Sequence, residues 1–209
     1  MARAYGKRIK IAIAGAVTIG AMSLFAITLV RATIYAPEQS GPPMVASLSS
    51  AGAVPIVSVP EAERPRRLII PSLGIDANVQ QVGVTPAGKM GTPDNFTDTA
   101  WYKYGPAPGQ LGDAVIDGHV DNGLSLPGVF KHLDSIAIGS DIYVVDQTGR
   151  RIHFVVTATS SYPYTDFPGS AVFTDAGTSR LTLITCVGSW VGKDRTYDHR
   201  LAVTAELRL

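Results

Sequence analysis

The sequence has little cysteine and no dominant charge. Cys186 is the only cysteine in 209 residues, so an intrachain disulfide is excluded. The net charge is +1, from 18 basic and 17 acidic residues, so nothing indicates nucleic-acid binding and no nucleic acid is expected as a partner. The acidic residues are scattered, and His119 with Asp121 is too small a set of ligands for a metal. We therefore expect neither a metal nor a cofactor.

The basic residues are concentrated at the N-terminus. Residues 1–65 hold six basic and three acidic residues, whereas residues 66–209 hold twelve and fourteen. Residues 1–10 contain four of the basic residues and are followed by an uncharged apolar run over residues 11–30. Twenty helical residues span about 30 Å, the thickness of a bilayer core. This pattern predicts a cytoplasmic basic segment at 1–10 and a transmembrane signal anchor at 11–30.

Two other interpretations of the apolar run stay open. A cleaved secretory signal usually has an apolar core of about 7–15 residues and small residues before the cleavage point. The best cleavage point here follows Ala36 and has Ile34 three positions before the cut. A buried helix of a soluble domain is less consistent with the run, because its sequence is not amphipathic. We expect a single-pass protein of the plasma membrane with its C-terminal domain outside.

The chain beyond the anchor divides into a linker and a domain. Residues 31–65 are rich in proline, serine, glycine and alanine and predict a flexible linker. Residues 66–209 are numerous enough to bury roughly 68–70% of their unfolded surface, so they can fold without a disulfide.

The pattern of residues 66–209 is mainly β. Short runs of β-branched and apolar residues alternate with turn signals, whereas helical patterns are confined to residues 127–136 and 170–174. Seven or eight short strands predict a closed barrel or a sandwich. The strands are expected over residues 67–71, 75–84, 113–119, 142–145, 152–159, 180–186 and 200–209.

Cys186 ends one of these expected strands. Alternation along the strand places Cys186 on the face opposite Leu183. A lone cysteine is often a small core residue, and it becomes a nucleophile only as a thiolate with a suitable partner. An unused thiol outside the membrane is a liability. Residue type alone therefore favours a structural cysteine, whereas the expected export favours a functional one.

A thiolate needs a proton donor, and the chain has four histidines. His119 follows a buried strand and a glycine, where functional residues often lie on loops held by a scaffold. His153 is expected in the wall of the fold, and His132 in a short helical piece. His199 precedes the last strand and is compatible with either role. His119 is thus the best candidate for an acid–base group.

Acyl transfer also needs a group that stabilises the negative charge developing on oxygen. Arg200 begins the last expected strand, beside Cys186 if the two strands pair antiparallel. Its guanidinium is permanently charged and donates two hydrogen bonds in a fixed geometry. Arg195, in the intervening loop, is the alternative.

These segments together resemble the sortase family. "LTLITC" resembles the TLxTC signature, "VIDGHVDN" resembles the strand-then-histidine motif, and "RLAVTAEL" resembles the last sortase strand, which opens with an arginine. "VFKHLDSIAIGSDIYV" resembles the segment that follows the histidine. "RLIIPSLGIDANVQQVGV" and "WYKYGPAPGQLGDAV" are most similar to the class F or class E sortases of actinobacteria. The resemblance covers nearly all of residues 66–209.

The resemblance implies an eight-stranded sortase-type β-barrel with one or two short helices, which acts as a cysteine transpeptidase. It implies Cys186 as nucleophile, His119 as general acid paired with the thiolate, and Arg200 as the group that positions substrate and stabilises the oxyanion. The implied substrate is an LPxTG-like sorting signal of a surface protein, cut between Thr and Gly. The acceptor is an amine of a cell-wall precursor, or water. The substrate-binding residues expected in the signature and in the connection over residues 161–180 are Thr185, Tyr162, Tyr164, Phe167 and Phe173.

The sequence departs from the family at one point and leaves two other functions open. Val187-Gly188 follows the cysteine where class F members often have a second glycine, and the "GSWVGKDRTYDH" loop has no clear counterpart. A catalytically inactive sortase-like barrel would serve as a surface binding or assembly module. An L,D-transpeptidase would also use a cysteine, but in that family a Ser-His-Gly stretch precedes it, and here Leu-Ile-Thr does.

Overall fold

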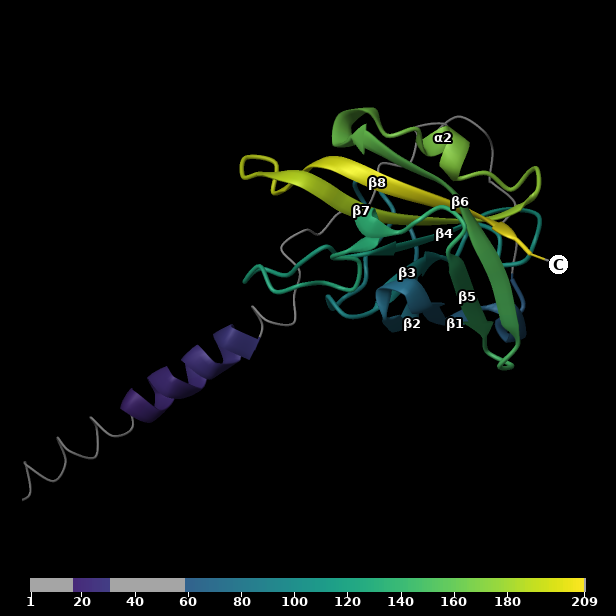
Figure 1. The fold of residues 1–209 in the computed structure, drawn as a ribbon. Helices are drawn as coiled ribbons and strands as arrows, with labels where there is room; N and C mark the ends of the chain where they lie inside the picture. Colours follow the sequence, from purple (N-terminus) through teal and green to yellow (C-terminus); the bar gives the residue numbers. More distant parts are fainter. Residues whose placement is uncertain (1–16, 31–58, 209) are drawn as a thin grey trace, which may run out of the picture.

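The computed structural model describes residues 17–30 and 59–208. Residues 59–208 form a closed barrel whose strands follow one another in the order β1-β2-β3-β4-β7-β8-β6-β5 (Figure 1). The prediction of a mainly β fold with an eight-stranded barrel is confirmed. The strands are β1 (Pro65–Ile70), β2 (Ile75–Val82), β3 (Thr99–Tyr102), β4 (Gly112–Gly118), β5 (Asp141–Asp146), β6 (Arg151–Pro163), β7 (Ser179–Val191) and β8 (Thr196–Leu207).

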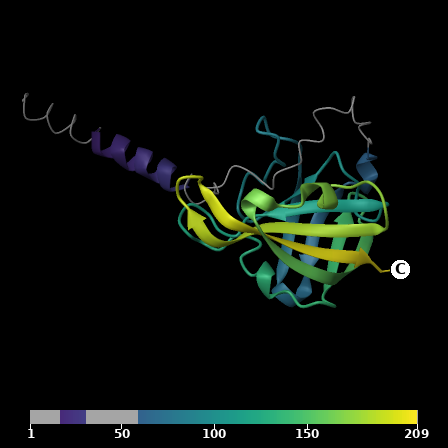
Figure 2. The ribbon, with the colours of Figure 1, turned by 90° about the horizontal axis from the view of Figure 1, so that it is seen from above.

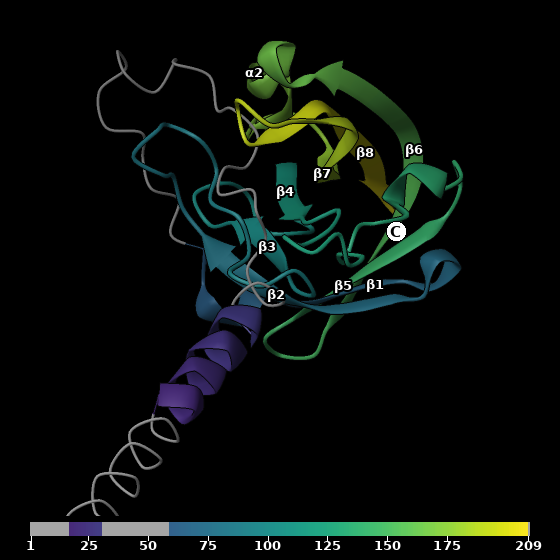
Figure 3. The same cartoon turned by 90° about the vertical axis from the view of Figure 1, so that its left-hand side faces the viewer.

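Seven strands were expected from the sequence and the eighth, β3, was missed. β3 has four residues, all buried, so it shows no alternation of apolar and polar side chains. It pairs parallel with β2 and antiparallel with β4. Figure 3 looks along the barrel and shows β3 completing the ring between β2 and β4.

The helical content is low, as the sequence pattern predicted. The helical pattern over residues 127–136 gives the 3-10 turn η4 (Leu133–Ser135), and that over 170–174 overlaps the single turn α2 (Gly169–Val172). Before η4, the Phe130 amide donates to the carbonyl of His119 rather than to a helical partner. The other 3-10 turns are η2 (Glu61–Glu63), η3 (Pro71–Leu73) and η5 (Tyr164–Asp166).

The N-terminal predictions lie partly outside the described residues. This applies to the basic segment 1–10, to residues 11–16 of the predicted anchor and to residues 31–58 of the predicted linker. Residues 17–30 form a helix whose side chains are exposed. Within the described part of the chain, no helix combines the length and the apolar character needed to cross a membrane.

The chain contacts the barrel at residues of the predicted linker, before β1 begins. Val59 is 3% exposed and packs in the core of the barrel. The Arg64 guanidinium donates to the Val59 carbonyl, and the Gln147 amide donates to the Arg64 carbonyl. Val59 and Arg64 therefore attach this short segment to the barrel before β1 begins at Pro65.

The barrel has one core inside and a second apolar cluster on its outer face. Leu181 and Leu183 of β7 point into the barrel, whereas Ile184 belongs to the outer cluster. The β6–β7 connection lies over this outer face (Figure 2), and its residues Phe167 and Val172 belong to the outer cluster. Strand β4 is buried along its whole length because it is covered on both sides.

Candidate active site

The pairing of three neighbouring strands brings the predicted catalytic residues into one row. Cys186 on β7 is the direct partner of Arg200 on β8. The parallel pairing of β4 with β7 ends at Asp117↔Ile184, so His119, two residues further on, lies level with Cys186. Cys186 belongs to the outer face, because Ile184 of that face precedes it by two residues. Arg200 and His119 lie beside Cys186 on the neighbouring strands, so they belong to the same face. The predicted position of Cys186 opposite Leu183 is confirmed.

The three side chains of this row are all largely buried. Cys186 is 8% exposed, His119 5% and Arg200 2%. A buried cation and a buried imidazole are costly unless the surrounding groups compensate them. The buried Arg200 and His119 side chains therefore need polar neighbours whose hydrogen bonds compensate for the loss of water.

The Arg200 guanidinium is held by its own strand. It donates to the carbonyls of Tyr197 and His199, each at 3.1 Å, and to the Thr196 hydroxyl at 2.7 Å. Arg195, the alternative, is exposed at the tip of the β7–β8 hairpin with a positive φ of 50°. Position and burial favour Arg200.

His119 is oriented by a backbone carbonyl that could not be predicted from sequence spacing. Its Nε2 lies 3.1 Å from the carbonyl oxygen of Pro93 in the β2–β3 connection. Because a carbonyl only accepts, Nε2 carries a hydrogen in this contact, and the contact fixes the orientation of the ring.

The backbone around His119 leaves no room for a side chain at two glycine positions, Gly118 and Gly128. A Cβ at Gly128 would lie 2.3 Å from the His119 carbonyl oxygen, and one at Gly118 would lie 2.6 Å from the Phe130 ring. Glycine at both positions lets the chain fold back tightly behind His119.

Among the predicted substrate-binding residues, two lie at the row. Tyr162 on β6 is the strand partner of Arg200. The Tyr164 hydroxyl donates to Asp194 at 2.8 Å, which raises the pKa of Tyr164, and the charge of Arg200 acts in the opposite direction. Both tyrosines thus lie on the Arg200 side of the row.

The other three have different surroundings. Phe167 is 8% exposed and packs edge-on against Tyr162 at 5.8 Å between ring centroids. Phe173 packs against Tyr102 at 5.3 Å. The Thr185 side chain lies on the face opposite Cys186, and its hydroxyl donates a hydrogen bond of 2.8 Å to the Gly118 carbonyl. Thr185 therefore joins β7 to the residue before His119.

The other histidines lie outside the row. His153 is in the barrel wall, 2.7 Å from the Asp141 carboxylate. His132 is exposed before η4, and His199 bonds to Asp198 at 2.9 Å. In the part of the chain that the structure describes, no three His, Cys, Asp or Glu side chains gather as a metal site.

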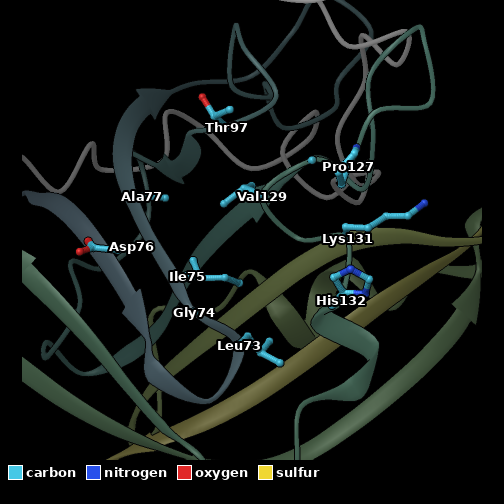
Figure 4. Close-up of a pocket in the computed structure, with 11 residues that line it drawn as sticks. Leu73, Gly74, Ile75, Asp76, Ala77, Thr97, Pro127, Val129, Lys131 and His132 are labelled. Carbon is cyan, nitrogen blue, oxygen red and sulfur yellow. The ribbon is translucent and has the colours of Figure 1, made fainter.

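Two cavities lie near the end of the barrel that carries the row. One of about 330 Å³ includes the residues that follow His119 and Cys186, namely Val120 and Val187, together with Tyr197. The other, of about 390 Å³, lies between the start of β2 and residues 127–132 (Figure 4). Neither contains His119, Cys186 or Arg200 in its lining.

Asp113 is a buried carboxylate on the outer face of β4, six residues before His119. Its carboxylate accepts from Thr182 at 3.0 Å and lies 3.5 Å from the Arg180 guanidinium. Burial nevertheless raises the pKa of Asp113 from 3.8 to about 6, since these contacts offset only part of the desolvation.

Replacement of this group, Asp113→Asn, is expected to stabilise the protein at neutral pH. The folded state holds the proton more tightly than the unfolded state, so the stabilisation that the acid supplies is complete below pH 3.8 and is lost as pH rises through about 6. At about 1.36 kcal/mol per pKa unit, the upper limit of the gain is about 3 kcal/mol. Urea unfolding at pH 7.5 and at pH 4 measures it.

A matched control is Asp76→Asn, at an exposed carboxylate whose hydrogen bond with Arg67 lowers its pKa. That change is expected to give no gain at pH 7.5. A gain for Asp113→Asn that persists at pH 4 would contradict the argument.

A closed barrel that aligns a cysteine between a histidine and an arginine has the framework of a cysteine transpeptidase. A sequence model of the sortase domain matches residues 68–208, more than half of the chain. The chain therefore belongs to the sortase family. A comparison with curated protein sequences finds no match.

Solved structures of several sortases share the fold. Sortase A from Corynebacterium diphtheriae is 22% identical with a TM-score of 0.52, and the match covers 70% of this chain and 62% of that one. Sortase C-1 from Actinomyces oris is 20% identical with a TM-score of 0.56 and coverages of 84% and 88%. A Clostridium perfringens sortase D5 transpeptidase is 18% identical with a TM-score of 0.52 and coverages of 68% and 78%. The assignment to class F or class E stays a prediction.

Proposed function

We propose that this sortase cleaves an LPxTG-like sorting signal between Thr and Gly and transfers the threonyl group to a cell-wall amine or to water. The observation that carries the proposal is the row of His119, Cys186 and Arg200 across β4, β7 and β8. The sequence motifs supply the residue types, and the strand pairing supports their alignment.

The first half of the reaction forms a thioester. The Cys186 thiolate attacks the threonine carbonyl carbon, and the carbonyl oxygen takes up negative charge. Arg200, fixed by three acceptors, stabilises that charge without reorganising. The C–N bond then breaks, and His119 protonates the departing glycine amine.

The second half reverses these proton movements. An acceptor amine or water loses a proton to His119 and attacks the thioester carbonyl. The C–S bond breaks and returns the thiolate. His119 acts as acid and then as base in one cycle, which suits a side chain whose ordinary pKa is near 6.5.

The substrate is proposed to lie over the outer face of the sheet. Tyr162 and Tyr164 flank Arg200 there, and the β6–β7 connection bounds that face. Phe167 and Phe173 support this boundary from the apolar cluster.

The test is to incubate the full chain in detergent with a library of sorting-signal peptides and to detect the adduct by mass spectrometry. The proposed chemistry predicts that Cys186 gains the mass of the acyl fragment ending in threonine. If no peptide in the library acylates Cys186 while the protein is folded, the proposal fails.

The low exposure of Cys186 supports a second candidate function, a catalytically inactive surface module. Only 8% of this residue is exposed. A thiol that only fills space is expected to react with iodoacetamide no faster than a buried cysteine, whereas a thiolate paired with His119 reacts faster at neutral pH. The rate of alkylation at pH 7 separates the two functions.

We also propose that residues 11–30 anchor the chain in the plasma membrane, with the barrel outside. This proposal is supported by the helix over residues 17–30, whose large apolar side chains, among them Ile19, Phe25 and Leu29, are exposed. Protease added to intact cells is expected to remove the barrel but leave residues 1–10 protected. Release of the protein from washed membranes by high salt or carbonate would contradict it.

A further inference from the structure

Tyr197 contacts Arg200 at one end of the row and the loop that follows His119 at the other, through different atoms. Its backbone carbonyl accepts from the Arg200 guanidinium at 3.1 Å. Its hydroxyl donates to Oδ2 of Asp121, 76 residues earlier in the chain and two residues after His119. One residue of β8 thus links the arginine of the site, through its backbone, to the loop after the histidine, through its side chain.

Asp121 is held firmly relative to His119. The chain folds back after His119 as a narrow hairpin, in which Phe130 donates to the His119 carbonyl at 3.0 Å and Gly128 donates to the Val120 carbonyl at 2.9 Å. Asp121 is 8% exposed, and its carboxylate lies 3.8 Å from the Lys131 ammonium. A force on the Asp121 side chain is therefore transmitted to His119.

The Tyr197 ring is also held. It packs edge-on against Trp190, its partner across the β7–β8 hairpin, with 5.4 Å between ring centroids. The ring lines the cavity of about 330 Å³ together with Val120 and Val187. The Tyr197 ring is therefore held in the β7–β8 hairpin, and its hydroxyl reaches the loop that follows His119.

The Tyr197–Asp121 hydrogen bond lies beyond the last paired residues of β4 and β7, where strand pairing no longer positions His119. Cys186 and Arg200 are aligned by the antiparallel ladder of β7 and β8. The ladder between β4 and β7 ends at Asp117↔Ile184, and β4 itself ends at Gly118. The position of His119 relative to the other two depends on contacts beyond the ladder, and Tyr197–Asp121 joins His119 to the Arg200 side.

We propose that Tyr197 and Asp121 are a positioning pair that sets the alignment of His119 with Cys186 and Arg200. The inference rests on the proposed function for its catalytic consequence. Neither residue needs to touch the substrate. A displacement of about 1 Å in a reacting group lowers a rate by about 100-fold, so a small relaxation of the His119 loop is enough to be measured.

The experiment compares Tyr197→Phe, Asp121→Ala and the double variant in the full chain. Each single change is expected to lower kcat by about 10- to 100-fold while KM for the peptide changes less than about 3-fold. The double variant is expected to be no slower than the slower single variant, since both changes break the same contact. Asp121→Asn, whose amide oxygen still accepts from Tyr197, is expected to restore most of the rate.

A second readout does not depend on any peptide. The pH profile for alkylation of Cys186 by iodoacetamide reports how well His119 stabilises the thiolate. It is expected to shift in Tyr197→Phe and Asp121→Ala. The matched control is Tyr143→Phe, which removes a hydroxyl from β5, where the ring stacks on His153. That control is expected to leave kcat and the profile unchanged.

The outcomes separate the two proposals. Unchanged alkylation profiles in Tyr197→Phe and Asp121→Ala would overturn the positioning pair, even if the wild-type chain accepts a peptide. Additive losses of kcat in the double variant would also overturn it. A shifted profile in a chain that accepts no sorting peptide would support the pair and refute the proposed function.

Discussion

Cys186→Ala is expected to abolish the thioacyl adduct and to lower peptide cleavage by at least about 10³-fold. Removing a covalent nucleophile eliminates the pathway that divides one difficult step into two easier ones. The loss should appear in kcat, because the residues that bind the peptide are untouched. Mass spectrometry measures the adduct, and chromatography of the cleaved peptide measures the rate.

The fold should tolerate this change. Cys186 lies in β7 and is paired with Arg200 across a continuous ladder of strand pairs. Replacement by alanine removes only one sulfur atom and leaves this backbone pairing intact. A loss of about 1 kcal/mol corresponds to a few degrees in Tm for a domain of this size. Cleavage at the wild-type rate by a folded Cys186→Ala protein would exclude the thioester mechanism.

Arg200→Lys is expected to lower kcat/KM by about 10²- to 10³-fold, the usual effect of removing one oxyanion donor. Lysine keeps the charge but has no planar fork, so it cannot make the bonds to Tyr197, His199 and Thr196 and still present a donor to the substrate. Steady-state kinetics with the best peptide from the library measures the loss.

The chain offers a close control for this substitution. Arg195→Lys makes the same chemical change five residues earlier, at the exposed tip of the hairpin. It is expected to alter kcat/KM by less than about 2-fold, as exposed charges usually contribute little. Equal losses in both variants would show that the charge of the hairpin matters rather than the position of Arg200.

Much of the fold was predictable because its strands have clear boundaries. Asp141–Asp146 and Arg151–Pro163 flank a turn that the sequence marks with Gly149, and each alternates buried with less buried residues over most of its length. Thr99–Tyr102 was not predictable in this way, because a short strand buried on both faces has no period to detect. Its place becomes clear only once β2 and β4 are both in the sheet.

The site was predictable for its three reactive residues and less so for their supports. Chemical type and expected strand-end positions singled out His119, Cys186 and Arg200. The strand-end expectation was wrong for two of them, because β7 continues past Cys186 to Val191 and β8 begins before Arg200 at Thr196; only His119 directly follows a strand end. The partners Pro93, which lies 26 residues before His119, and Tyr197, which lies 76 residues after Asp121, come together only through the order of the strands. Sequence spacing carries no trace of such contacts, and Asp121 entered the sequence analysis only as part of a set too small to bind a metal.

The two ends of the barrel domain offer attachment points away from the chemistry. Pro65 pairs with Asp146 at the end of β5, and the Arg208 amide donates to the His153 carbonyl near the start of β6. Strand directions place both ends opposite the row of His119, Cys186 and Arg200, with three strand spacings of about 4.8 Å between them. Fluorescent labels, surface linkers or fused partner domains joined there should leave access to the thiol unobstructed, and a short peptide joining the ends would give a circular permutant with new termini elsewhere.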